Sequence, residues 1–143
     1  MKRRPPRANG RRPAYLVLAV ATGLLAVAGC TGPGAEQAGQ VAESFERLAP
    51  DDAAQACDLL AGHTREAVEK SAKRDCAEAL GDEDLPDPSS VTSVEVYGHD
   101  ALVHLGDDTV FLARFAEGWK VTAAGCRPGS SADEPFDCDV SGG

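Results

Sequence analysis

Apolar residues recur at helical spacing in three stretches of the chain beyond residue 38. The spacing predicts one helix ending at Pro50, a second stopped by Gly62, and a third that runs from a cap at Thr64 to Gly81. The charged run at residues 73–75 leaves open a break of the third helix into two pieces. The three apolar stripes are Val41, Phe45, Leu48 and Ala49; Ala53, Ala56, Cys57 and Leu60; and Val68, Ala72, Cys76, Ala79 and Leu80.

A proline-rich connector, Asp82–Ser90, separates this helical part from a part in which apolar and polar residues alternate. The alternation predicts four strands at about residues 91–97, 101–105, 109–115 and 119–124, and a glycine in each interval is typical of a hairpin turn. Helices followed by an antiparallel meander indicate the α+β class. We expect three N-terminal helices packed on one face of a curled, cone-like sheet of four strands.

The first 29 residues have the three parts of a bacterial signal peptide. Residues 1–13 carry six Lys and Arg and no acidic residue, and the apolar run Ala14–Ala28 is 15 residues long. That run is shorter than the roughly 20 residues that a membrane-spanning helix needs. The junction Val27-Ala28-Gly29-Cys30 resembles the bacterial lipobox, in which a peptidase cuts before a cysteine that carries lipid. An uncleaved membrane helix is the alternative.

Cleavage before Cys30 predicts a mature lipoprotein on the extracytoplasmic face of the cell membrane, held there by diacylglycerol and palmitate on that cysteine. We expect export by the general secretory route, and the pairs Arg3-Arg4 and Arg11-Arg12 leave the twin-arginine route as the alternative. The mature chain then divides into a lipidated flexible tether at residues 30–38, an α+β domain at 39–126 and a polar tail at 127–143.

The mature chain is strongly acidic. Beyond residue 29 there are eight Lys and Arg against 23 Asp and Glu, a formal charge of −15 compared with −9 for the whole chain. Nucleic acid repels such a polyanion, so nucleic-acid binding is excluded, and lipid on Cys30 is the one membrane contact that we expect. Ten Arg against four Lys, with abundant Ala and Gly, is typical of a high-GC genome such as that of an actinobacterium.

Four cysteines are left once Cys30 carries lipid, and an even number outside the cytoplasm predicts disulfides. Of the three pairings, we favour Cys57 with Cys76, which lie on the inner stripes of consecutive helices, and Cys126 with Cys138, which would staple the tail. A metal or redox site is the alternative. We expect no metal and no cofactor, because the chain has no Cys-x-x-Cys and no histidine within four residues of these cysteines.

The segment from Phe115 to Val121, an aromatic residue and a turn followed by Gly-Trp-Lys-Val, closes the predicted meander. It resembles the end of the sheet in the nuclear transport factor 2-like superfamily, the cone-shaped fold of ketosteroid isomerases. The resemblance covers residues 38–125 at most and departs from the fuller fold, since no strand hairpin lies between the second and third helices. The segment AGCRP with PFDC downstream is also similar to small actinobacterial lipoproteins without an assigned activity.

The resemblance implies a cavity in which an Asp or His could abstract a proton. His104 with Tyr97 is the pair that could point into it, whereas His63 and His99 fall in turns, and Leu102 shares the face of His104. We expect all three histidines to be solvated or structural, and we assign no catalytic residue. The acidic run at residues 82–84, with an aspartate at 87, lacks the spacing and glycine of a calcium loop and reads as a solvated connector.

We therefore expect a non-catalytic module that binds either a small apolar ligand or a neighbouring envelope protein. The alternative is a cone-fold isomerase, dehydratase or cyclase acting on a small apolar substrate. An enzyme of that sort needs polar groups that converge in a buried cavity, and a binding module does not. The sequence makes no prediction of the oligomeric state.

Overall fold

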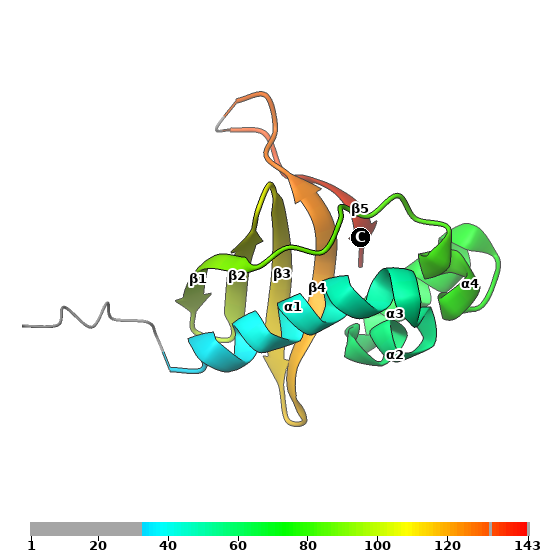
Figure 1. Ribbon diagram of the computed structural model, residues 1–143, viewed down its shortest axis with the longest axis horizontal. Helices are drawn as coiled ribbons and strands as arrows, with labels where there is room; N and C mark the ends of the chain where they lie inside the picture. The colour runs from blue at the N-terminus through cyan, green and yellow to red at the C-terminus, as the bar shows by residue number, and fades with distance from the viewer. Residues whose placement is uncertain (1–32, 132, 143) are drawn as a thin grey trace, which may run out of the picture.

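The computed structural model describes residues 33–131 and 133–142, and these residues form the expected α+β arrangement (Figure 1). This part of the chain contains four helices, where the sequence predicted three, and five strands, where the sequence predicted four. The helices are α1 (Ala35–Asp51), α2 (Ala53–Leu59), α3 (Gly62–Ala72) and α4 (Cys76–Gly81). The strands are β1 (Val91–Tyr97), β2 (Asp100–Leu105), β3 (Asp108–Phe115), β4 (Gly118–Arg127) and β5 (Asp137–Ser141). The signal peptide, Cys30 and the first residues of the expected tether lie outside the described residues.

The predicted third helix is two helices, which corrects the expectation of three. Lys73 ends α3 in the left-handed conformation, with φ of 56°. Asp75 then caps α4, because its side chain accepts the Glu78 N–H at 3.2 Å. The charged run at 73–75 is therefore the break that the sequence left open.

Helix α1 begins earlier than expected, at Ala35, so residues 35–38 of the expected flexible tether are helical. Ala35 and Ala38 are both buried against the sheet, which explains why these residues join the domain. At its other end α1 continues to Asp51, past the predicted end at Pro50. Asp52 then caps α2 by accepting the Gln55 N–H at 3.1 Å, as its position before Gln55 suggests.

The sheet is an antiparallel meander in the order β1-β2-β3-β4-β5, and it stays open instead of closing. Strand β5 corrects the expectation of four strands, since part of the tail pairs with β4. Val140 stands opposite Ala124 and is 1% exposed, so it adds to the core. The tail is thus held by a strand as well as by a disulfide.

The core lies between α1 and the inner face of the sheet. The helix runs across that face, and α2, α3 and α4 gather beside its C-terminal end (Figure 1). Phe45 of α1 is fully buried, as are Val103, Val110 and Val121 of three successive strands. Burying such side chains contributes about 1.5–3 kcal/mol each, which makes this contact the main source of stability.

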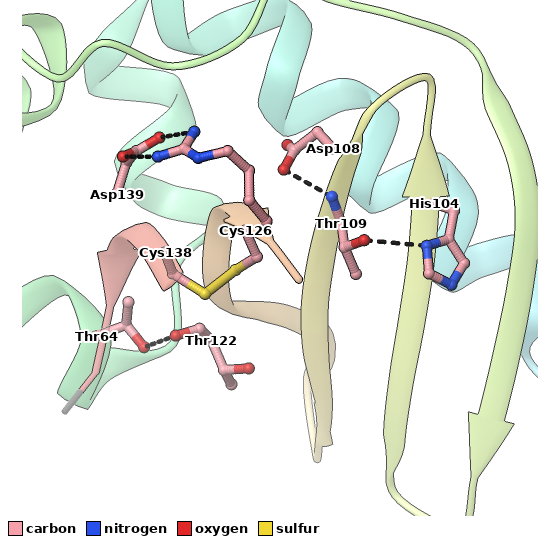
Figure 2. The surroundings of a disulfide bond; sticks show 9 residues. Thr64, His104, Asp108, Thr109, Thr122, Cys126, Cys138 and Asp139 are labelled. Carbon is pink, nitrogen blue, oxygen red and sulfur yellow. Dashed lines mark hydrogen bonds and ion pairs between the residues drawn. A yellow bond between two sulfur atoms is a disulfide. The ribbon is translucent and has the colours of Figure 1, made fainter. Parts of the chain in front are cut away.

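Two disulfides join Cys57 to Cys76 and Cys126 to Cys138, the pairing that the sequence favoured. The first connects α2 to the start of α4, and the second links the paired strands β4 and β5 (Figure 2). Their cysteines are 19 and 12 residues apart. Loops of this size correspond to about 3 kcal/mol of stabilisation each in the chain-entropy view. Among the described residues, no helix is both long enough and apolar enough to cross a membrane.

Candidate functional site

An open groove of about 800 Å³ lies between the N-terminal half of α1 and the hairpin that joins β3 to β4. We call it the α1–hairpin groove. Helix α1 supplies one wall and the hairpin supplies the other. Its lining residues are Pro33, Gly34, Gln37, Gln40, Val41, Ser44, Leu59, Arg114, Glu117, Gly118, Trp119 and Lys120.

Arg114 and Trp119 form one end of the α1–hairpin groove. They are cross-strand partners in the β3–β4 hairpin, and the guanidinium carbon lies 4.7 Å from the centre of the indole ring. The Arg114 Nη2 also donates to the carbonyl of Pro33 at 2.8 Å. A cation over an aromatic face gains about 0.5–1 kcal/mol at an exposed site, so stacking and hydrogen bond together fix the charge in place. Trp119 is 7% exposed beneath it.

Lys120 supplies a second fixed cation to the α1–hairpin groove. Its Nζ donates to the carbonyl of Asp58 at the end of α2, at 2.8 Å. The apolar side chains Val41 and Leu59 and polar side chains of α1 also line the groove. The groove therefore combines apolar surface with two cations and the carboxylate of Glu117, so its lining is net positive in a domain that is otherwise acidic.

The sequence analysis did not identify this groove. A signal was present in the hairpin itself. A two-residue turn at Ala116-Glu117 places Arg114 opposite Trp119, on the same face of the sheet. What the sequence could not indicate is that Pro33 and α1 would cover that face.

His104 lies on the face of the sheet opposite α1, since its neighbours Val103 and Leu105 point into the core. Its Nδ1 lies 3.0 Å from Thr109 Oγ1, and its Nε2 lies 3.5 Å from Glu95 Oε1 (Figure 2 shows the contact with Thr109). Glu95 on β1 thus places a carboxylate beside His104, a neighbour that the sequence analysis did not identify. The two side chains are 33% and 49% exposed.

Tyr97 completes the cluster around His104, and its hydroxyl donates to the other oxygen of Glu95. This hydrogen bond, followed by the contact with His104, lowers the pKa of Glu95 and keeps it ionised. Tyr97 is itself 60% exposed. The pair that was considered for a dry cavity thus lies in contact with water, where acid–base catalysis gains little from burial.

His63 and His99 occupy exposed positions, as their placement in turns suggested. His63 lies in the first turn of α3, and its Nε2 is 3.5 Å from Thr64 Oγ1, which donates to the carbonyl of Thr122 at 3.1 Å. His99 follows β1, and its carbonyl accepts the Arg114 N–H at 2.7 Å. Both residues therefore have structural neighbours, and among the described residues neither forms an ion pair with a carboxylate.

A buried pair of carboxyl groups, Glu46 and Asp108, lies where α1 meets the start of β3. Their residues are 6% and 3% exposed. Glu46 Oε2 accepts the Ser89 N–H at 3.2 Å, and Asp108 Oδ1 accepts the Thr109 N–H at 2.6 Å. The second oxygen of each carboxyl has no donor among the described residues. A proton between the two groups resolves this, because two facing acceptors can then form a hydrogen bond.

Burial, the larger cause, and the hydrogen bond with Asp108 together raise the pKa of Glu46 to about 8. At neutral pH Glu46 is therefore protonated and donates to Asp108. The sequence analysis missed this pair, because an acidic residue in an amphipathic helix is usually solvated. The pair lies behind Ser89 of the connector and lines none of the grooves described here.

Within the described residues, no three His, Cys, Asp or Glu side chains gather in a way that could hold a metal ion. The acidic run at residues 82–84 is exposed, and Asp82 forms an ion pair with Arg74. No protein-family model, no curated protein and no solved structure matches the chain.

Proposed function

We propose that the protein is a lipoprotein on the extracytoplasmic face of the cell membrane and that its domain is a non-catalytic binding module. The α1–hairpin groove takes a small ligand with an apolar body and an anionic group. The observation that carries this proposal is the pair of cations, Arg114 and Lys120, held at fixed positions beside apolar surface.

The anionic group of the ligand is inferred from how the two cations are anchored. Each donates to a backbone carbonyl, from Pro33 or from Asp58, so each stays beside the groove without being neutralised by that partner. A guanidinium has five N–H donors and an ammonium has three, so one bond to a carbonyl leaves capacity for a ligand. A carboxylate or phosphate makes strong, charge-assisted hydrogen bonds with such donors.

The place of the groove on the chain favours a ligand that comes from the membrane surface. Pro33 lines the groove, and Cys30 stands three residues before it. Three extended residues span at most about 11 Å, so lipid on Cys30 would keep the groove close to the bilayer. Amphipathic molecules concentrate at that interface.

The alternative, a cone-fold enzyme, needs an acid–base group inside a cavity. His104 and Glu95 are within reach of each other, yet they lie on the exposed face of the sheet, away from the groove. Glu46 and Asp108 are buried behind the connector. This distribution supports binding without catalysis, and the resemblance to the nuclear transport factor 2-like superfamily remains a prediction about ancestry.

Fluorescence of Trp119, the single tryptophan of the chain, tests the proposed ligand class. The mature chain with Cys30→Ser is titrated with decanoate and with decanol, which share an apolar body but differ in charge. We expect saturable binding of decanoate and weaker binding of decanol. Loss of a hydrogen bond to a charged group costs about 1.5–3 kcal/mol, so Arg114→Gln should weaken decanoate binding by about 10- to 100-fold.

Lys70→Gln is the matched control, because Lys70 is an exposed cation on α3. It removes the same charge from the domain without touching the groove, and decanoate binding should be unchanged. Equal affinity for decanoate and decanol would contradict an anion site. Equal weakening by Arg114→Gln and Lys70→Gln would show that only the net charge matters.

A further inference from the structure

Strand β1 is an edge of the sheet, since it pairs with β2 on one side and with no other described strand on the other. Every second residue of an edge strand directs its N–H and C=O outward, where another chain can pair with them. The register of β1 with β2 is regular from Ser93 to Tyr97, and a bulge interrupts it between Val91 and Ser93. The regular part is long enough for a short extended peptide.

A second groove, of about 320 Å³, lies between this edge and α1. We call it the α1–β1 groove. Val91 and Val94 line it from the strand, and both stay half-buried, so apolar surface is left open beside the edge. Gly39 lets the helix approach closely, because a Cβ there would come 3.3 Å from a methyl of Val94. The edge thus has an apolar slot next to its backbone groups.

The rim of the α1–β1 groove carries only negative charge. Glu36 and Glu43 extend from α1 along the slot, and no Lys or Arg lines it. The mature domain as a whole has a formal charge of −15. A partner that carries Lys or Arg is attracted to this rim, and an acidic partner is repelled.

We propose that β1 accepts an extended segment of a partner protein as a sixth strand. Every second side chain of this segment faces the α1–β1 groove. Among these, apolar side chains fill the groove, and Lys or Arg side chains on the same face pair with Glu36 and Glu43. This is strand addition, in which backbone hydrogen bonds give affinity and alternate side chains give specificity. The proposal is independent of the ligand assigned to the α1–hairpin groove, which uses the hairpin side of α1.

The charges favour a different protein over a second copy of this chain. Two copies paired edge to edge along β1 would bring Glu36 and Glu43 of one protomer to an equally acidic rim on the other. Like charges across an interface suppress such pairing. A lipid surface does not offer the row of N–H and C=O groups that the edge requires.

Three capped synthetic octapeptides test the proposal with the whole mature chain bearing Cys30→Ser. In the first, a valine–lysine peptide, lysine, valine, valine and lysine occupy alternate positions and so share one face, with serine at the positions between them. The second has glutamate in place of lysine, and the third is the valine–lysine peptide N-methylated along one edge. We expect the first to shift the NMR signals of the β1 amides and to slow hydrogen exchange at Val94 to Tyr97. The glutamate and N-methylated peptides should bind at least tenfold more weakly.

The double variant Glu36→Gln/Glu43→Gln tests the rim. An exposed charge pair is worth up to about fivefold in affinity, so the variant should bind the valine–lysine peptide up to about 25-fold more weakly, and less so at high salt. Glu66→Gln/Glu83→Gln is the matched control, because both residues are exposed and lie away from this groove. Equal binding of the N-methylated peptide, or shifts confined to the α1–hairpin groove, would overturn the proposal. If the chain associated with itself and the peptide could not displace this association, the proposal of a different partner would be wrong, and β1 would pair with β1 of a second copy.

Discussion

Replacing Glu46 by glutamine should abolish most of the pH dependence of folding stability near neutrality. Glutamine keeps an acceptor for the Ser89 N–H and a donor for Asp108, so it reproduces the contacts of the protonated carboxyl. It cannot ionise. The wild-type chain must release the Glu46 proton as the pH rises, and the buried site opposes that release.

The size of the effect follows from the pKa of Glu46, which rises from 4.5 to about 8 on folding. Between these values the unfolded chain has lost the proton and the folded chain still holds it. The free energy of unfolding therefore falls by about 1.4 kcal/mol per pH unit, is greatest below pH 4.5, and levels off above about pH 8. From pH 6 to pH 7.5 the loss amounts to about 2 kcal/mol.

Urea unfolding of the mature chain with Cys30→Ser and both disulfides intact provides the assay. The difference in free energy of unfolding between wild type and Glu46→Gln should change by about 2 kcal/mol from pH 6 to pH 7.5, and the change should favour the variant. The free energy of unfolding falls by roughly 1–3 kcal/mol per molar urea, so such a change should shift the urea concentration at the unfolding midpoint by about 1 M. Taking the difference cancels the pH dependence of every other ionisable group, since both chains share these groups.

Glu66→Gln is the control for this experiment, because Glu66 is an exposed carboxylate on α3. The free energy of unfolding of the Glu66→Gln variant should follow that of the wild type at every pH. Parallel curves for wild type and Glu46→Gln would refute the reasoning, since they would mean that Glu46 is ionised in the folded chain at pH 6. If Glu46→Gln instead gained stability relative to the wild type as the pH fell, the effect would have the opposite sign, and this would refute the reasoning as well.

Three further predictions concern the anchor, the second disulfide and the cluster on the exposed face. Cys30→Ser should prevent incorporation of radiolabelled fatty acid and leave the signal peptide attached; labelling equal to wild type would contradict the lipobox. Cys126→Ala/Cys138→Ala should lower the free energy of unfolding by about 3 kcal/mol and speed proteolysis after residue 127, whereas an unchanged urea midpoint would show that β5 pairing suffices. His104→Ala should leave decanoate binding within twofold of wild type, and a tenfold loss would place the ligand on the other face of the sheet.

The helices and the first four strands were predictable because each has a local signature. Phe45 repeats with its neighbours at helical spacing, and Ala101, Val103 and Leu105 recur at every second position along their strand. Strand β5 lacks such a signature, since Val140 is its one buried residue and its other positions are polar or cysteine. Its conformation comes from pairing with β4, which is a contact between segments and leaves no period in the tail.

The polar contacts were not predictable, because each depends on which residues the fold brings together. Glu46 stands on a helix and Asp108 follows a turn, so the sequence alone describes two solvated carboxylates. Glu95 reaches His104 only once the register of β1 and β2 is known. The disulfides were easier to assign, because Cys57 and Cys76 lie on inner stripes of neighbouring helices and Cys126 has only Cys138 left.

Under the proposed export, the order of the disulfides along the chain bears on how the protein would mature. The pairs follow one another without crossing or nesting, Cys57 with Cys76 and then Cys126 with Cys138. If the chain leaves an export channel N-terminus first and lipid occupies the thiol of Cys30, as we propose, each cysteine would meet its native partner as the next to emerge. Consecutive oxidation then yields the native bonds directly, and the slow reshuffling of mispaired cysteines is avoided.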